Sequence, residues 1–443
     1  MNGRADGNGP QVKALEELAD LRVPVTEKGL GSLAWREPLT ARSLREHPRP
    51  LHGGEFSFPM AVIDRAALTA NIDAMAAWCR EHGVQIAPHG KTYMSPEIAH
   101  QQMASGAWAI TVASISQLQA YHAYGVRRFV VANQLADRAG IAWLARAVPQ
   151  PMGGWDGTST DLSVCVNVDS EEGVAFLADE LARADVRRPL DVLVELGHPG
   201  GRTGARSLDA AWAVAVAVAA RPELHLAGVS GYEGTLGHHG SSEENDRVAG
   251  WCRDLAKLGG DLFAAGLLAP GYVITAGGSA FPDVVALTLH AAAVEGEPTV
   301  VLRSGAYAIH DDGYYASVTP HDRDADGPRL RPALSLWAPV LSRPEPGLAL
   351  LLLGRRDAGF DEGLPIPREI RRRDGRRSPA HGLTITALND QHAFLTVAEH
   401  TELGPGDLVH VGISHPCTTL DKWRVIPVLD ETEQVVDLIH TFF

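Results

Sequence analysis

From about residue 58 to residue 307, the chain alternates short apolar runs with longer segments whose apolar positions recur at helical spacing. Continuous apolar runs that are each followed by a helical segment are typical of parallel strands covered by helices. The predicted strands are residues 60–64, 85–89, 109–114, 129–133, 162–168, 190–196, 224–229, 272–276 and 299–303. The predicted helices include residues 65–81, 96–105, 116–123, 171–184, 208–220, 243–265 and 282–292.

Eight strand–helix units form a (β/α)8 barrel, whereas this pattern contains one strand more. We therefore expect the surplus strand, either the first or the last, to belong to the neighbouring domain. A doubly wound open sheet is the alternative, but eightfold repetition over about 250 residues favours the barrel. The predicted fold class is α/β, with a TIM-like (β/α)8 barrel over residues 56–308.

After residue 307 the pattern changes to short apolar runs separated by turns rich in Pro, Gly and Asp. This pattern predicts a mostly β domain over residues 309–443, and its charged stretches 321–330 and 368–378 are predicted to be exposed loops. Residues 1–55 form an N-terminal extension that packs either on the β domain or on a partner subunit. The strands predicted in the β domain are residues 333–340, 348–353, 383–388, 393–398, 408–412 and 423–428.

The formal net charge of −15 argues against nucleic acid or an anionic membrane surface as a partner. The four cysteines are widely scattered and lack the spacing of a disulfide framework, which indicates a reduced, cytoplasmic setting. Residues 1–11 are polar and do not resemble a secretory signal. The longest apolar helical run, residues 210–220, is too short to span a bilayer. We therefore expect a soluble protein.

Lysine is rare in this chain, whose positive charge lies almost entirely on arginine. Lys91 follows the predicted strand 85–89, at the end of a barrel strand where active-site groups gather. Arginine stays protonated near neutral pH, whereas a desolvated lysine can lose its proton and form a Schiff base. Lys91 is therefore the first candidate for chemistry, although most lysines are solvated surface residues.

A glycine turn, Gly277-Gly278-Ser279, follows the predicted strand 272–276 and precedes a helix. Such a turn lets backbone N–H groups approach a phosphate, and the next helix offers its positive end. A purely structural turn is the alternative for the glycines alone. Together with Lys91 at another strand end, however, the turn indicates a barrel that binds pyridoxal phosphate.

In the β domain, His415-Pro416-Cys417 places an imidazole and a thiol two residues apart. We expect an extended segment there, with both side chains on one side, because proline disfavours a helix. Imidazole and thiolate suit Zn²⁺, while a packed cysteine beside a loop histidine is the alternative. His392 is a possible further ligand or supporting group. The adjacent pair at residues 238 and 239 is interpreted as loop histidines.

Together, these motifs resemble the D-serine dehydratase and D-threonine aldolase family, in particular its bacterial amino acid deaminase branch, over residues 58–443. That family consists of fold-type III pyridoxal phosphate enzymes, in which an alanine-racemase-like barrel precedes a β domain. The resemblance is carried by residues 88–92 (Pro-His-Gly-Lys-Thr), 95–97 (Ser-Pro-Glu), 201–204 (Gly-Arg-Thr-Gly), 277–279, 303–307 (Arg-Ser-Gly-Ala-Tyr), 390–392 (Asp-Gln-His), 415–417, 421–424 (Asp-Lys-Trp-Arg) and 441–443 (Thr-Phe-Phe).

The resemblance implies that Lys91 is the catalytic Schiff-base lysine, that Arg202 contacts the phenolic oxygen of the cofactor and that Tyr232 lies near its ring. It also implies a metal ion on His415 and Cys417, with Zn²⁺ expected and Mn²⁺ or another divalent ion as the alternative. The implied cofactor-binding residues are Lys91, His89, Arg202, Tyr232, Gly277, Gly278 and Ser279.

His-x-Cys, in place of the His-x-Asp typical of aldolase members, favours dehydration of a D-3-hydroxy amino acid to a 2-oxo acid and ammonia. The expected partner is a small D-amino acid, and the expected assembly is a homodimer. Residues 418–422 depart from the eukaryotic D-serine dehydratases, which leaves the substrate open. The alternatives are a metal-dependent D-threonine aldolase, which forms glycine and an aldehyde, and a non-catalytic pyridoxal phosphate carrier.

Overall fold

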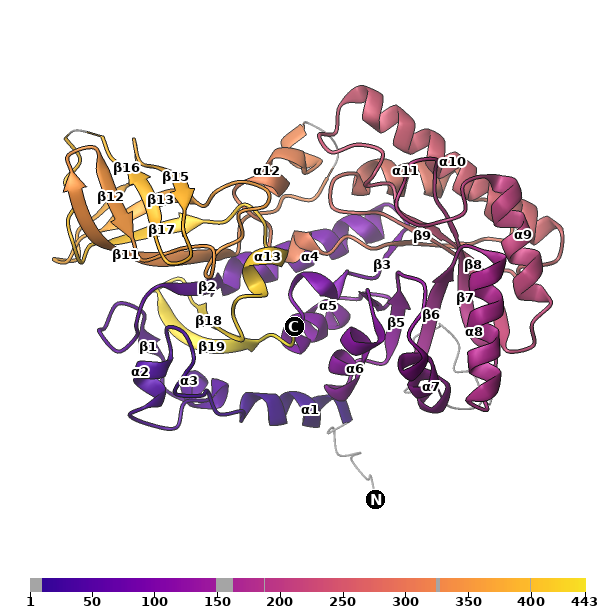
Figure 1. Cartoon of the computed structure of the whole chain (residues 1–443), viewed down its shortest axis with the longest axis horizontal. Coiled ribbons are helices and arrows are strands. Elements are labelled where there is room, and N and C mark those ends of the chain that lie inside the picture. Colours follow the sequence, from indigo (N-terminus) through magenta and orange to yellow (C-terminus); the bar gives the residue numbers. More distant parts are fainter. Residues whose placement is uncertain (1–9, 149–161, 187, 324–326, 399) are drawn as a thin grey trace, which may run out of the picture.

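The computed structural model describes residues 10–148, 162–186, 188–323, 327–398 and 400–443. Figure 1 shows two bodies side by side, a barrel with its helices and a β domain. The N-terminal helices lie beneath the β domain, and the C-terminus ends between the two bodies. The barrel comes from the middle of the chain, whereas the β domain combines residues from both ends.

The barrel consists of eight parallel strands in the order β3-β10-β9-β8-β7-β6-β5-β4. The backbone N–H of Trp108 donates to Ile86 O at 2.7 Å, and that of Thr111 donates to Pro88 O at 2.8 Å. These bonds join the two ends of the strand order, so the sheet closes and the predicted fold class is confirmed. The strands are β3 (Gln85–Ile86), β4 (Ile110–Val112), β5 (Arg128–Val131), β6 (Ser163–Val168), β7 (Leu190–Leu196), β8 (Leu224–Gly231), β9 (Val273–Ala276) and β10 (Thr299–Leu302).

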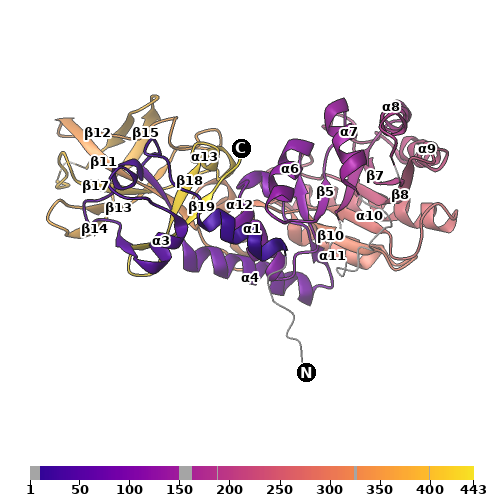
Figure 2. The ribbon, with the colours of Figure 1, turned by 90° about the horizontal axis from the view of Figure 1, so that it is seen from below.

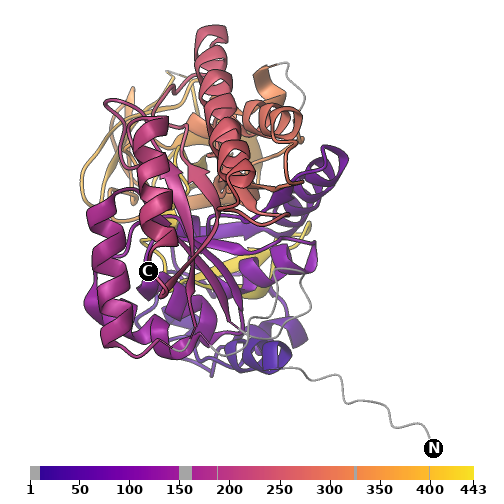
Figure 3. The same ribbon diagram turned by 90° about the vertical axis from the view of Figure 1, so that its right-hand side faces the viewer.

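The barrel interior explains why its strands read as continuous apolar runs. An inner cluster draws residues from the successive strands and is separate from the larger apolar layer that the helices cover. Figure 3, in which the barrel faces the viewer, shows the helices standing around the strands. The inner cluster contains Ala87, Trp108, Ala109, Val130, Cys165, Leu193, Val273 and Val301. The covering helices are α4 (Arg65–Glu81), α5 (Pro96–Ala104), α6 (Ile115–Ala123), α7 (Arg138–Ala147), α8 (Glu171–Arg183), α9 (Leu208–Ala219), α10 (Ser242–Ala264) and α11 (Pro282–Ala292).

The surplus strand of the barrel pattern is the first one, β2 (Met60–Asp64). It pairs antiparallel with β11 and parallel with β18, so it belongs to the large sheet of the β domain. That sheet has the strand order β1-β19-β18-β2-β11-β12-β16-β15, with β13, β14 and β17 branching from it. Its other strands are β1 (Arg49–Pro50), β11 (Leu334–Glu345), β12 (Leu348–Leu351), β13 (Ile366–Arg371), β14 (Arg377–Pro379), β15 (Thr384–Leu388), β16 (Ala393–Thr396), β17 (Leu408–Gly412), β18 (Val425–Leu429) and β19 (Gln434–His440).

The basic stretch 368–378 is not the exposed loop that we predict from its charge. It forms the β13–β14 hairpin, and Ile370 is buried with 1% of its surface exposed. Its arginines pair with acids, Arg368 with Asp312 and Arg377 with Glu369, which neutralises the charge along the strands. Opposite charges on neighbouring strands stabilise such pairing, so net composition was misleading here.

The prediction for residues 321–330 is also wrong at its start. His321–Arg323 forms a 3-10 turn, and Arg323 packs inward, where it donates to Ala280 O at 2.9 Å and Asp283 at 3.1 Å. Residues 324–326 of the same stretch lie outside the described residues. The ion pair with Asp283 explains why this arginine leaves solvent.

The N-terminal segment contains α1 (Pro10–Ala19), α2 (Gly31–Ala34) and α3 (Ala41–Glu46). Leu33 and Leu44 join an apolar cluster with Trp337 and Leu438 of the β domain. Figure 2 shows α3 beside the strands of the β domain. Thr40 and Ser43 form a capping box at the start of α3, which fixes where the helix begins. The segment therefore packs on the β domain of its own chain.

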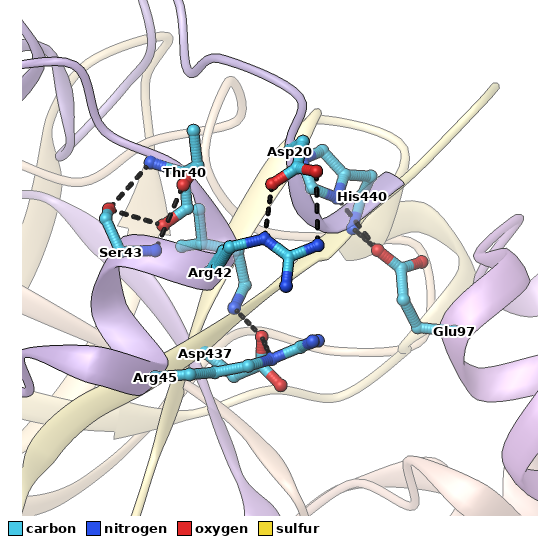
Figure 4. A network of polar contacts seen from close by, with 9 residues as sticks. Asp20, Thr40, Arg42, Ser43, Arg45, Glu97, Asp437 and His440 are labelled. Atoms are coloured by element: carbon cyan, nitrogen blue, oxygen red, sulfur yellow. Dashed lines mark hydrogen bonds and ion pairs between the residues drawn. The ribbon is translucent and has the colours of Figure 1, made fainter. Parts of the chain in front are cut away.

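The end of β19 connects the β domain to the barrel (Figure 4). Glu97, at the start of α5, accepts from the backbone N–H of His440 at 3.0 Å and from its Nδ1 at 2.8 Å. Two residues later, the backbone N–H of Phe442 donates to Met94 O at 2.9 Å. The C-terminal segment is thereby attached to the turn that follows Lys91.

Within the described ranges, no helix combines the length and the apolar character needed to cross a membrane. The longest of them, α10, carries several charged residues along its length.

We predict that Glu97→Ala destabilises the protein by about 1–3 kcal/mol, because it leaves two largely buried donors of His440 without an acceptor. Urea-induced unfolding, followed by circular dichroism, measures this change. Asp20→Ala is the matched control, since it removes an exposed ion pair with Arg42 in the same region and should leave the midpoint almost unchanged. Equal effects of the two variants would contradict the role of Glu97.

Candidate active site

One cavity of about 310 Å³ lies where the carboxyl ends of the barrel strands face the β domain. Every site residue that the sequence predicts lines it. These residues are His89, Lys91, Arg202, Tyr232, Gly277, Gly278, Ser279, His415 and Cys417. Lining residues outside that prediction include Thr92, Glu195, His238, Arg303, Asp311, Tyr314, Tyr315 and Glu362.

Lys91 sits in a 3-10 turn, Gly90–Thr92, directly after β3. The Tyr121 hydroxyl donates to Gly90 O at 2.8 Å, and a Cβ on Gly90 would lie only 2.7 Å from that hydroxyl. Glycine is therefore required for the close approach that holds the turn. Burial lowers the pKa of Lys91, and the charges of Arg202 and Arg303 lower it too, whereas Cys417 opposes them. The free amine is thus more available than in a solvated lysine.

Arg202 lies in the loop after β7, and its guanidinium stacks on the Tyr232 ring at 4.6 Å from the centroid. Arg206 holds this loop, because it donates to the carbonyl oxygens of Gly201, Arg202 and Thr203 at 2.9–3.1 Å. Burial raises the pKa of Tyr232 to about 12, so its hydroxyl stays protonated. The pair presents a fixed cation beside an aromatic ring.

The glycine turn is held from behind by a carboxylate that the sequence analysis did not single out. Glu233 is fully buried and accepts from the backbone N–H of Gly277 at 3.0 Å and of Gly278 at 2.5 Å. Gly277 has φ +103°, a conformation that favours glycine. Because Glu233 engages these two N–H groups, the part of the turn free for an anion begins at Ser279.

Arg303, directly after β10, lines the cavity and is buried with 5% of its surface exposed. It donates to Thr275 Oγ1 at 2.8 Å and to Gly231 O at 2.5 Å. Burial lowers its pKa, whereas the nearby charges of Glu233 and Glu195 raise it. The carboxylates of Glu233 and Glu195 thus balance the charge of the Arg303 guanidinium, which its hydrogen bonds hold in place.

His89 stays neutral, because burial and the charges of Lys91, Arg303 and Arg202 hold its pKa well below the ordinary value. Its Nδ1 is buried without a hydrogen-bond partner. A polar atom in this position is available to a ligand in the cavity.

All four cysteines are free, but only Cys417 is not buried. Its Sγ lies 3.4 Å from Thr92 Oγ1, one residue after Lys91. Cys79 is buried away from the cavity, and burial raises the pKa of its thiol to about 12. Cys417, by contrast, lines the cavity. This contact places the predicted metal pair beside the predicted Schiff-base lysine.

The segment that carries the pair is not extended, contrary to the sequence prediction. Pro416 has φ −67° and ψ −39°, and the helix α13 begins at Cys417. Proline is compatible with the start of a helix because the first N–H groups have no intrahelical acceptor. His415 and Cys417 nevertheless line the same cavity, which was the functional point of the prediction.

His415 donates its Nδ1–H to Asp361 Oδ2 at 2.7 Å, which leaves Nε2 for a ligand. Burial lowers the pKa of His415, but Cys417 and Asp361 together raise it to about 9. Within the described part of the chain, no group of three or more His, Cys, Asp or Glu side chains is gathered around a possible metal position. His392 does not line the cavity. The predicted metal pair thus has one supporting carboxylate, that of Asp361.

His238 is the residue that the sequence analysis set aside and that the structure brings to the cavity. Glu244 fixes its loop by accepting from the backbone N–H groups of His238 and His239 at 3.0 Å and 3.1 Å. Tyr314 donates its hydroxyl to His238 O at 3.3 Å across the cavity mouth. A histidine pair in a loop gives no sequence signal of this placement, because only one of the two side chains faces the site.

Comparisons with known proteins agree with this geometry. The family described as "Putative serine dehydratase domain" matches residues 333–429. D-threonine aldolase of Arthrobacter sp is 30% identical over 355 residues, which cover 78% of this chain and 82% of that enzyme. D-threo-3-hydroxyaspartate dehydratase of Delftia sp. (strain HT23) is 26% identical over 409 residues, covering 86% of this chain and 97% of that enzyme.

The fold is also that of a solved relative. The crystal structure of D-threonine aldolase from Filomicrobium marinum has a TM-score of 0.72 and 24% identity, and the match covers 89% of this chain and 96% of that chain. Given the identity and coverage shared with the Arthrobacter aldolase, the chain belongs to the D-serine dehydratase and D-threonine aldolase family of fold-type III pyridoxal phosphate enzymes.

Proposed function

We propose that this protein is a pyridoxal phosphate-dependent lyase that removes water from D-3-hydroxy amino acids, such as D-threonine or D-serine. The products are a 2-oxo acid and ammonia. The observation that carries the proposal is the contact between Cys417 and Thr92, which places a thiol–imidazole pair beside Lys91 in one cavity. A lyase needs a base at the α-carbon and assistance for the leaving hydroxyl group, and Lys91 and the His415–Cys417 pair line the same cavity.

The residues present fit pyridoxal phosphate. Lys91 would hold its aldehyde carbon, Arg202 and Tyr232 would flank its ring, and the turn at Ser279 would receive its phosphate. The unpartnered Nδ1 of His89 and the cations Arg202 and Arg303 suit an anionic ligand. When bound, the cofactor supplies an electron sink for charge that develops at the substrate α-carbon.

Lys91 Nζ is positioned to take the α-proton, because its burial favours the neutral amine that a base requires. The Gly90–Thr92 turn holds this amine on the barrel side of the cavity. Loss of the 3-hydroxyl group then leaves an unsaturated amine, which hydrolyses in water to the 2-oxo acid and ammonia. Because Lys91 approaches the substrate from one face only, it can remove the α-proton of the D-enantiomer but not that of the L-enantiomer.

His415 and Cys417 fit a divalent metal ion, with Zn²⁺ preferred for a thiolate–imidazole pair. The hydrogen bond from Nδ1 to Asp361 orients the ring so that Nε2 faces the cavity. Two protein ligands leave other coordination positions open. When bound, the ion would supply a Lewis acid for the leaving hydroxyl group.

The alternative function is retro-aldol cleavage to glycine and an aldehyde, as in D-threonine aldolase. That reaction needs a base at the 3-hydroxyl group, and His238 is an imidazole of the cavity wall that suits this task. A carboxylate in place of Cys417 is expected in aldolase members, so the thiol favours dehydration. A non-catalytic carrier is disfavoured because the paired His415 and Cys417 would then have no function.

We predict that Lys91→Ala and Lys91→Arg both abolish the visible absorbance of bound pyridoxal phosphate and reduce turnover to background. Arginine keeps the positive charge but cannot form the covalent bond to the cofactor. Lys257→Ala is the control, because Lys257 is exposed and pairs only with Asp261. Absorbance spectra of the purified proteins decide the matter, and an unchanged spectrum for either Lys91 variant would refute the assignment.

We predict that the purified protein converts D-threonine to 2-oxobutanoate and ammonia. The 2-oxo acid is measured with a coupled dehydrogenase, while glycine and acetaldehyde are measured in the same reaction by chromatography. L-threonine serves as the control and should not react. Glycine and acetaldehyde as the main products would replace dehydration with the aldolase alternative.

We predict that chelation lowers turnover roughly 100-fold or more, because the leaving hydroxyl group loses its Lewis acid. Adding Zn²⁺ back should restore the rate, and elemental analysis should find about one equivalent of metal in the untreated protein. Cys417→Ala should lose both the metal and the rate while it keeps the visible absorbance of the cofactor. Full turnover by the metal-depleted protein would remove the metal from the mechanism.

A further inference from the structure

Asp311 is a buried carboxylate of the cavity wall that the mechanism above does not use. It exposes 1% of its surface and follows the short connection after β10 that leads into the β domain. Its Oδ1 accepts from the backbone N–H of Gly313 and of Tyr315, both at 2.9 Å. These bonds fix the carboxylate at the start of α12 (Tyr314–Val318).

The second oxygen of Asp311 has no such partner. Oδ2 is buried and makes no hydrogen bond, although the residue lines the cavity. A buried carboxylate oxygen without a donor is costly, and native proteins usually satisfy it with protein, water or ligand. The burial that raises the pKa of Asp311 to about 7 reflects the same lack of solvation.

Asp311 also lies on the side of the cavity that carries the predicted metal pair. The backbone N–H of Asp312 donates to Ile413 O at 2.8 Å, and Gly313 packs against Ser414. Asp311 is therefore attached to the strand that leads directly into His415. Lys91, by contrast, approaches from the barrel wall.

We propose that Asp311 Oδ2 accepts a hydrogen bond from the 3-hydroxyl group of the substrate and so selects 3-hydroxy amino acids. This inference rests on the proposed function. The substrate amine is directed to the Lys91 side, and a carboxylate oxygen attracts donors, so the hydroxyl group is the donor left for Asp311. A second carboxylate at carbon 3, as in 3-hydroxyaspartate, would be repelled.

The charges of the other lining groups support this assignment. Glu195 already accepts from Gln134 at 2.5 Å and from Thr203 at 2.9 Å. Arg303 donates to Thr275 and Gly231, so it does not neutralise Asp311. Asp311 is thus a buried acid of the cavity lining whose Oδ2 can accept a hydrogen bond from a ligand.

The test compares a ligand that has the hydroxyl group with one that lacks it. For the Asp311→Asn holoenzyme, we expect kcat/KM for D-threonine to fall roughly 10- to 100-fold. The inhibition constant of D-2-aminobutyrate, which differs only in the missing hydroxyl group, should change less than about threefold. Wild-type protein should also prefer D-threonine over D-threo-3-hydroxyaspartate.

Glu362→Gln is the matched control, because it removes another lining acid, one that is exposed, and should affect both ligands equally. If Asp311→Asn does not fold, Asp311→Ser replaces it, since serine can accept from the Gly313 N–H while it removes Oδ2. Parallel losses for both ligands, or an unchanged rate with D-threonine, would overturn the inference alone. A wild-type holoenzyme that is inert toward every D-3-hydroxy amino acid would overturn the proposed function, and the inference with it.

Discussion

The attachment of the C-terminal segment to the barrel is the contact on which the cavity depends. Glu97 holds His440, and Met94 holds Phe442, so the β domain is fixed to the turn that follows Lys91. The hydroxyl of Thr441 then donates to Trp423 O, next to the helix that begins at Cys417. Because one short segment binds both sides, the thiol of Cys417 lies against Thr92. A barrel alone would present Lys91 at an open strand end, without the wall that carries His415 and Cys417.

The electrostatic arrangement below the cavity follows from the same closure. Arg303 is buried among Glu195 and Glu233, and its donors are used by Thr275 and Gly231. Its charge is thus held in place and largely balanced, whereas Arg202 remains available above the Tyr232 ring. If the Arg202 guanidinium were mobile, it could pair with neighbouring acidic side chains and would then be less available to an anionic ligand. The fixed arrangement therefore leaves the cavity ready for an anionic ligand without a large rearrangement.

Much of this arrangement was accessible from the sequence, because parallel strands and their carboxyl-terminal ends have a strong pattern. Lys91, Arg202 and the glycine turn each follow an apolar run, so their convergence could be predicted. The course of the chain through the β domain could not be predicted in the same way. The β13–β14 hairpin reads as a basic loop, since the pairing of Arg368 with Asp312 and of Arg377 with Glu433, both outside the hairpin, has no local signature. Asp311 was missed for the same reason, because its placement depends on contacts with the segment that precedes His415. His238 was missed because the histidine pair does not reveal which of the two residues lines the cavity.

The division of the cavity between two domains also explains how related chains can differ in reaction. The barrel wall contributes the groups that suit the cofactor, and these lie on strand ends whose geometry is set by the barrel itself. The opposite wall consists of Asp311, α13 and the loop at Asp361, none of which is part of the barrel. Substitutions on that wall can change the leaving-group chemistry or the accepted side chain while Lys91 keeps its environment. Reaction and substrate in this family should therefore follow the residues between Asp311 and Cys417 more closely than overall sequence identity.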